Sequence, residues 1–317
     1  MGRHRFLAFV VLAYGISWSL WLVAANGGGQ VPFLLGALGP MAAAAIVTVW
    51  SGQSLVTWIR PLWRWRVPVR WWIYALGLPA LLYAVVTLIL QIIGSPVDWS
   101  LSLDRLPSYL STFVFVLFLG GGLEEPGWRG FGLPVLQERH SPLLATVVLG
   151  LVWGVWHIPV YGLLGFVVPW ILAFFYTVLW NATGSLLLCI LLHASFTPAQ
   201  DNLILLPQEQ AYTTALDNPD WAILATYLLA ALIIVALTHG RLGLRGSGGR
   251  LVQPASRGDR PHRVRGDDDP HRHGCQPEAA RSDGISMGGT AGSGRSAASD
   301  VRDLPESKHR WKGEDLS

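Results

Sequence analysis

Long, nearly uncharged runs of apolar residues constrain this chain more than any other feature of its sequence. A helix needs about 20 predominantly apolar residues to cross the hydrocarbon core of a bilayer. Runs of that kind lie at about 6–25, 31–50, 71–93, 109–123, 142–163, 166–180, 184–200 and 221–238. We therefore expect an all-α fold, a polytopic membrane helical bundle of about eight transmembrane helices.

The charge distribution separates an apolar part from a polar part. Charged residues make up 14% of the chain, against about 25% in ordinary soluble domains. Nine Arg balance nine acidic residues through position 238, so the net charge of +3 comes from the remainder. The basic balance is therefore no argument for nucleic-acid binding by the folded part. The expected surroundings are the lipid bilayer.

Two regions follow from this split, a transmembrane domain at 1–240 and a tail at 241–317. The tail is rich in Gly, Ser, Arg and Asp, and such a composition cannot bury enough apolar surface to order itself. A disordered basic cytoplasmic tail and the product of a frame shift both fit it. The first apolar run is longer than the 7–15 residues of a signal-peptide core, so we expect an uncleaved anchor.

The positive-inside rule predicts the orientation, because cytoplasmic loops carry an excess of Arg and Lys. One set of expected loops holds Arg3, Arg5, Arg60, Arg64, Arg66, Arg70, Arg129, Arg139, Arg241, Arg245 and Arg250. The other set holds Arg105 with Asp98, Asp104, Glu209, Asp217 and Asp220. We expect a multi-pass protein of the cell membrane with both termini in the cytoplasm.

Ionisable residues inside the spans are the candidate functional residues, because each is costly in a membrane unless it is paired or functional. They are Glu124, Glu125, Arg129, His157 and His193. The four-residue spacing of Glu125 and Arg129 predicts a pair on one helix face. Glu124 is then expected to point to a different face of the helix.

Positions along an antiparallel hairpin place these groups at one depth. Glu124 lies 16 residues before His140, near the expected turn, and His157 lies 17 residues after it. At about 1.5 Å per residue, the two reach nearly the same level. His193 matches His157 in its distance from the extracytoplasmic end of its span. Thr197 follows His193 by one turn, on the same face.

This set of side chains indicates hydrolysis by either of two routes. Glu124, His157 and His193 are the ligand types of a hydrolytic zinc site, with a position open for water. Equally, a buried Glu can act as a general base on water, assisted by His. A serine nucleophile is disfavoured, because neither Ser185 nor Ser195 has a buried acid–base partner apart from His193.

Three motifs in order resemble a known family. They read Glu124-Glu125-Pro-Gly-Trp-Arg129, Trp153-Gly-Val-Trp-His157 and His193-Ala-Ser-Phe-Thr197. Together they are similar to the CAAX prenyl protease and bacteriocin-processing (CPBP) family of intramembrane endopeptidases. The resemblance covers about residues 105–205.

The resemblance implies a role for each motif residue. Glu124 and His157 would activate the water, and Arg129 would hold Glu125. His193 and Thr197 would stabilise the tetrahedral intermediate or complete a metal site, with a divalent metal such as zinc as the possible cofactor. The sequence departs from the family at two positions. Trp153 replaces the usual Phe, which we interpret as conservative packing, and Thr197 replaces Asn or Asp with a hydroxyl of shorter reach.

The expected function is therefore cleavage of membrane-associated protein or peptide substrates, prenylated or unprenylated. A non-catalytic scaffold or immunity protein derived from such a protease is one alternative. A transporter is another, because Glu and His in spans also mark ion pathways. Transporters commonly show inverted repeats, and we detect none in this sequence.

Overall fold

The computed structural model describes residues 2–207 and 218–244, all within one compact unit, Met1–Arg257. Every regular element in these residues is helical. The predicted all-α fold is thereby confirmed. The expected tail lies outside the described residues from position 245 onward, as do Glu209 and Asp217.

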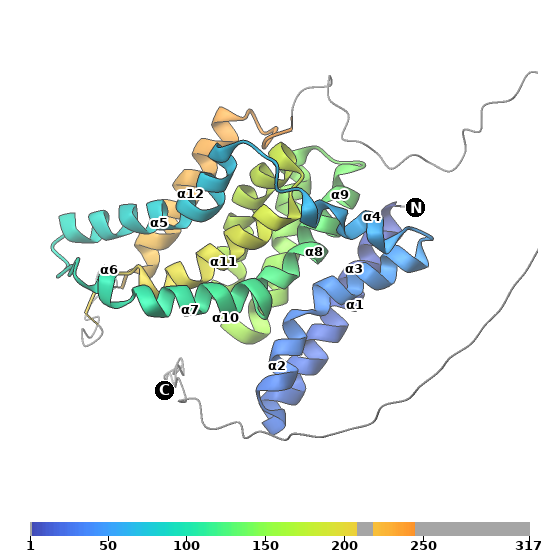
Figure 1. Ribbon diagram of the computed structural model, residues 1–317, viewed down its shortest axis with the longest axis horizontal. Helices are drawn as coiled ribbons and strands as arrows, with labels where there is room; N and C mark the ends of the chain where they lie inside the picture. Colours follow the sequence, from blue (N-terminus) through green and yellow to red (C-terminus); the bar gives the residue numbers. More distant parts are fainter. Residues whose placement is uncertain (1, 208–217, 245–317) are drawn as a thin grey trace, which may run out of the picture. The chain divides into compact units, whose positions relative to one another are not determined.

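The helices differ widely in length (Figure 1). The longest are α1 (Gly2–Val23), α5 (Val69–Ile92), α10 (Pro142–Thr183), α11 (Leu186–Asn202) and α12 (Asp220–Leu237). Shorter α-helices are α2 (Gln30–Ala37), α3 (Gly39–Trp50), α4 (Leu55–Ile59), α6 (Leu101–Asp104) and α7 (Leu106–Phe118). The π-helical turn η1 (Ala24–Gly28) and the 3₁₀ turn η2 (Arg60–Trp63) complete the first part of the chain.

Six helical segments among the described residues are long and apolar enough to span a membrane. They are His4–Gly28, Val69–Ile92, Leu106–Gln137, Pro142–Leu163, Gly165–Thr183 and Asp220–Leu237. The pair α2 and α3, bent by 49°, adds a seventh if it counts as one broken span. The remaining expected run forms α11, whose 17 residues extend only about 26 Å. The polytopic bundle is confirmed, with six or seven full-length spans where eight were expected.

Helix α10 is a hairpin of two spans that meet at Gly162. Its backbone there has φ 63° and ψ −150°, a conformation outside the helical region. Gly150 and Gly154 let the two halves pack closely. An added Cβ on Gly150 would lie 3.0 Å from Ala173, and one on Gly154 would lie 2.9 Å from the ring of Phe166. Small residues four apart commonly permit such close approach in membrane helices.

The span that begins with α7 is broken where the two glutamates lie. After Phe118 the chain continues through η3 (Gly121–Glu124), α8 (Glu125–Gly127), the π-helical turn η4 (Trp128–Gly132) and α9 (Leu133–Gln137). Residues 124–129 of this broken segment are all buried. Irregular backbone at membrane depth is tolerated where protein surrounds it, and π-helical turns are frequent at functional sites.

Helix α11 lies at the centre of the packing around this broken segment. It contacts α5, α7, η3 and α10 (Figure 1), and most of its residues are buried. Helix α1 pairs with α3, and α3 contacts α8 in turn. The broken segment is therefore held between α11 and the pair formed by α1 and α3.

Candidate active site

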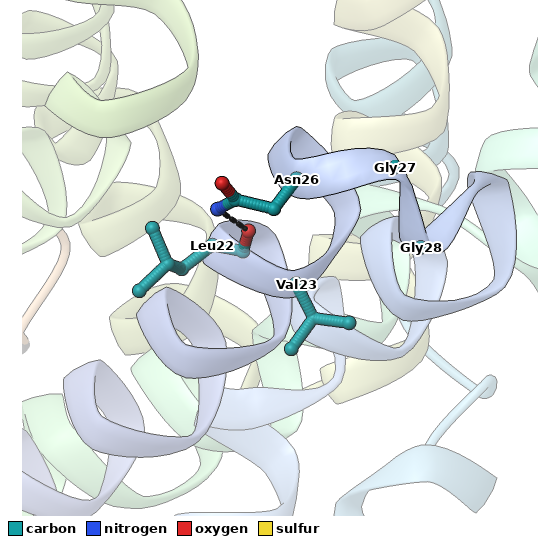
Figure 2. Close-up of a pocket in the computed structure, with 5 residues that line it drawn as sticks. All are labelled: Leu22, Val23, Asn26, Gly27 and Gly28. Atoms are coloured by element: carbon teal, nitrogen blue, oxygen red, sulfur yellow. Dashed lines mark hydrogen bonds between the residues drawn. The ribbon is translucent and has the colours of Figure 1, made fainter.

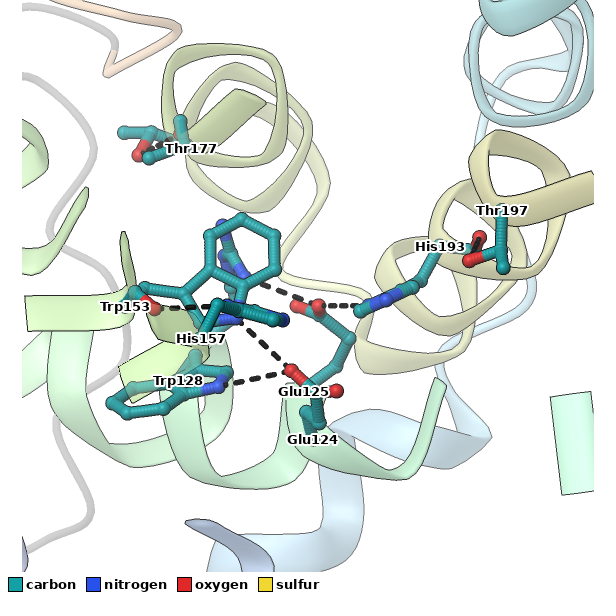
Figure 3. Close-up of polar contacts among 10 residues, drawn as sticks. Glu124, Glu125, Trp128, Trp153, His157, Thr177, His193 and Thr197 are labelled. Carbon is teal, nitrogen blue, oxygen red and sulfur yellow. Dashed lines mark hydrogen bonds and ion pairs between the residues drawn. The ribbon is translucent and has the colours of Figure 1, made fainter. Parts of the chain in front are cut away.

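Glu125 forms the centre of a buried ionic cluster. Its Oε1 accepts a hydrogen bond from Nη1 of Arg129 at 3.1 Å and lies 2.8 Å from Nδ1 of His193 (Figure 3). The side chains of Glu125 and Arg129 are completely buried. The predicted pairing of these two residues on one helix face is confirmed. Because Oε1 of Glu125 already accepts from Arg129, we assign it as the acceptor from His193 as well. Nδ1 of His193 then carries a proton.

Two aromatic rings enclose the Arg129 guanidinium. Its Cζ lies 4.0 Å from the ring centre of Trp153 and 4.1 Å from that of Tyr176. A cation held over aromatic faces gains electrostatic stabilisation, which is larger where water is excluded. Arg129 was counted as a cytoplasmic loop residue from the sequence, and that assignment is wrong, because its side chain is completely buried.

Glu124 points away from this cluster and accepts hydrogen bonds from two indoles. Its Oε2 lies 3.0 Å from Nε1 of Trp153 and 3.3 Å from Nε1 of Trp128 (Figure 3). The residue is 4% exposed. Both bonds reach Oε2 rather than Oε1 of this carboxylate.

His157 is oriented by its own helix. Its Nδ1 lies 2.9 Å from the carbonyl oxygen of Trp153, and a carbonyl can only accept, so Nδ1 is the donor. The ring of Trp156 packs against the imidazole edge to face, with centroids 4.8 Å apart. In the neutral form of the ring, Nε2 is therefore the hydrogen-bond acceptor.

The two ring nitrogens of His193 have different neighbours, a carboxylate on one side and the backbone of a glycine on the other. Nδ1 binds Glu125, while Nε2 faces Gly121 at the start of η3. A Cβ on Gly121 would overlap Nε2 and lie 2.9 Å from Cε1. Gly121 thus leaves room beside this nitrogen that any other residue would fill.

Thr197 lies one turn beyond His193 on α11, as expected, but its hydroxyl is turned toward the helix. Oγ1 is 3.4 Å from the carbonyl oxygen of His193, at the long end of the hydrogen-bond range. In Figure 3 Thr197 lies on the side of His193 away from Glu124 and His157. The structure therefore gathers five of the six predicted residues and leaves Thr197 at the edge.

The predicted metal ligands are not arranged as a three-ligand site. In the part of the chain that the structure describes, no three His, Cys, Asp or Glu side chains are placed to hold one metal ion. The donor chemistry accounts for this, because Oε1 of Glu125 engages one nitrogen of His193 and the Arg129 guanidinium places a cation nearby. Glu124 is meanwhile held by two indole N–H groups.

The sequence interpretation missed three aromatic partners of the site. Trp153 donates to Glu124, which a Phe could not do, so its interpretation as conservative packing is wrong. Trp128 donates to the same oxygen, and Tyr176 covers Arg129. The four-residue spacings from Glu124 to Trp128 and from Trp153 to His157 were the available signals.

A separate pocket lies where α1 ends and η1 follows. Figure 2 shows this pocket, of about 500 Å³, lined by Leu22, Val23, Asn26, Gly27 and Gly28. Asn26 donates to the carbonyl of Leu22 at 2.7 Å. None of the predicted site residues lines it, and it holds no ionisable side chain, so it is not the candidate site.

Comparison with known proteins places the cluster in a recognised family segment. Residues 106–197 match the family model described as type II CAAX prenyl endopeptidase, Rce1-like. A protein named CAAX prenyl protease 2, from Methanococcus maripaludis, is 38% identical over 61 residues. That alignment covers 19% of this chain and 21% of the relative. The resemblance drawn from the motifs is confirmed for this segment, and all six predicted site residues fall within it.

Proposed function

We propose that this membrane protein is an intramembrane endopeptidase that hydrolyses a peptide bond in membrane-associated proteins or peptides. The observation that carries the proposal is the buried arrangement of Glu124, Glu125, Arg129, His157 and His193 within the matched segment. Ionisable groups at membrane depth are costly, and they persist where they serve a function.

In the proposed reaction, Glu124 acts as the general base on water. Oε1 of Glu124 takes a proton from the water while Nε2 of His157 accepts a hydrogen bond and orients it. The resulting hydroxide adds to the carbonyl carbon of the substrate. The carboxyl group then returns the proton to the leaving amine nitrogen, and the peptide bond breaks. General acid–base catalysis of this kind contributes about 10²–10⁴-fold to a rate.

His193 is proposed to stabilise the oxyanion. Glu125 binds Nδ1, so a protonated His193 would present Nε2–H to the developing charge, beside the bare backbone of Gly121. A carboxylate that orients a histidine and supports its charged form is a recurrent catalytic device. Thr197 would add a second donor after its hydroxyl rotates away from the helix carbonyl. Arg129 holds Glu125 in place.

The decisive experiment compares cleavage by the wild type and Glu124→Gln in detergent, with prenylated and unprenylated CAAX peptides as substrates. We expect the wild type to cleave and Glu124→Gln to be inactive. Glu138→Gln is the matched control, because that glutamate pairs with Arg5 at the surface. A folded wild-type protein that cleaves none of these peptides would contradict the proposal and favour a non-catalytic scaffold.

Metal dependence is tested on the same preparation. The proposed chemistry uses side chains alone, so cleavage should persist after a chelator has removed bound zinc. The metal content of the purified protein is measured alongside. Loss of activity with the chelator and its recovery with zinc would show that a metal, rather than Glu124 alone, activates the water.

A further inference from the structure

Two neighbouring tryptophans of α10 differ in what their indole N–H groups do. Trp153 and Trp156 are both buried, 2% and 1% exposed, and both pack against His157. Nε1 of Trp153 donates to Oε2 of Glu124 at 3.0 Å. Nε1 of Trp156 has no hydrogen-bond partner among the described residues.

Trp153 also contacts three other residues of the site, His157, Arg129 and His193. Its carbonyl accepts from Nδ1 of His157, and its ring covers the Arg129 guanidinium. The imidazole of His193 lies edge to face against it, with centroids 5.8 Å apart. A ring alone would make the aromatic contacts, so only the bond to Glu124 requires an indole.

Glu124 depends on such donors because the nearby cation is already engaged. The guanidinium of Arg129 binds Glu125 rather than Glu124. The hydrogen bonds from Trp153 and Trp128 are the ones that Glu124 accepts within the described residues. Hydrogen bonds to an ionised group are shorter and stronger than neutral ones, and the bond from Trp153 is the shorter of the two.

We propose that Trp153 is a positioning residue, whose indole N–H fixes Oε2 of Glu124 and so directs Oε1 at the attacking water. The inference rests on the proposed function, in which Glu124 is the general base. Trp128 supports the same oxygen from the broken segment itself. The two indoles together hold the carboxylate in one rotamer from two sides.

Trp153→Phe tests this role, because it keeps an aromatic ring beside Arg129 and His193 but removes the N–H. We expect kcat to fall about 10- to 100-fold, as for the loss of a hydrogen bond to a charged group. KM should stay within about twofold, because substrate binding is not changed. Trp156→Phe is the matched control, and its kcat should equal that of the wild type.

Three results would overturn the inference. They are an unchanged kcat in Trp153→Phe, an equal fall in Trp156→Phe, and a rise in KM without a fall in kcat. Thermal unfolding in detergent shows whether each variant is folded. If Trp153→Phe fails to fold, the second measurement decides.

That second measurement does not require cleavage. Indole ¹⁵N–H resonances in detergent are recorded for the wild type and Glu124→Gln, with assignments from triple-resonance spectra that link each indole to its backbone. The Trp153 and Trp128 resonances should shift in Glu124→Gln, and the Trp156 resonance should not. An unshifted Trp153 resonance would overturn the inference. Absence of cleavage by the wild type would contradict the proposed function separately.

Discussion

The pair of Glu125 and Arg129 shows how much a single residue contributes to this site. Both side chains are completely buried, so removing either partner leaves the other without its countercharge. Breaking a buried ion pair on one side typically costs about 3–5 kcal/mol. Replacing both partners costs far less, because no uncompensated charge remains.

Arg129→Met should therefore lower the free energy of unfolding by about 3–5 kcal/mol, and it should abolish cleavage because Glu125 and His193 lose their anchor. The double variant Glu125→Gln/Arg129→Met should be more stable than Arg129→Met alone. Chemical unfolding in detergent measures both. If the double variant is the less stable one, the pair is not the main interaction of either residue.

Thr197 is one of the two positions at which the chain departs from the motifs of the family that it resembles, and its role is still a prediction. Losing one oxyanion donor costs about 10²–10³ in rate. Thr197→Val keeps the shape of the side chain and removes the hydroxyl, so kcat should fall by about that factor. Thr197→Asn supplies a longer donor and should match or exceed the wild type. Unchanged cleavage by Thr197→Val would leave His193 as the sole donor of the proposed mechanism.

At the scale of the elements, the bend of α10 brings the half that carries Tyr176 back beside the half that carries Trp153 and His157. Gly162 has φ 63° and ψ −150°, a conformation that is essentially restricted to glycine. An added Cβ would meet nothing within 4 Å, so strain rather than crowding is the cost. The turn therefore requires glycine for its backbone alone.

Gly162→Ala should lower the free energy of unfolding by about 1–3 kcal/mol. Gly15→Ala is the control, because Gly15 lies within a regular helix and its added Cβ also meets nothing within 4 Å. That change should be neutral or stabilising. Thermal unfolding of both variants in detergent is the measurement. Equal stability of Gly162→Ala and the wild type would show that the turn accommodates a side chain.

Helix positions and the main ionic contact could be predicted from the sequence, whereas the detailed hydrogen bonding could not. Apolar run length indicated the spans, and the spacing of Glu125 and Arg129 indicated their pair. The chain breaks at Gly120-Gly121-Gly122, but the directions of the two glutamates that follow depend on packing against α11, which no local pattern reports. For the same reason, the depths estimated from residue spacing placed Glu124 and His193 at one level. They did not show that Glu125, rather than Glu124, contacts His193.

On the scale of the whole unit, contacts between distant loops fall into two sets. Arg5 pairs with Glu138, and the guanidinium of Arg64 lies against Gly184. In the other set, Arg105 donates to the carbonyl oxygens of Ile204 and Leu206. These sets coincide with the two loop groups of the arginine analysis, which supports alternating passage of the spans through the membrane.

The side on which each set lies is predicted by the arginine excess, even without Arg129, because cytoplasmic loops carry the positive charge. Accessible positions are Gln53, in the Arg-rich set, and Leu103, in the other; both are exposed. Cys189 is buried, so Cys275→Ser gives a background with little reactive thiol. In intact cells, a membrane-impermeant maleimide should label Leu103→Cys. Gln53→Cys should react only after permeabilisation. The reverse pattern would contradict the predicted orientation and would place both termini outside.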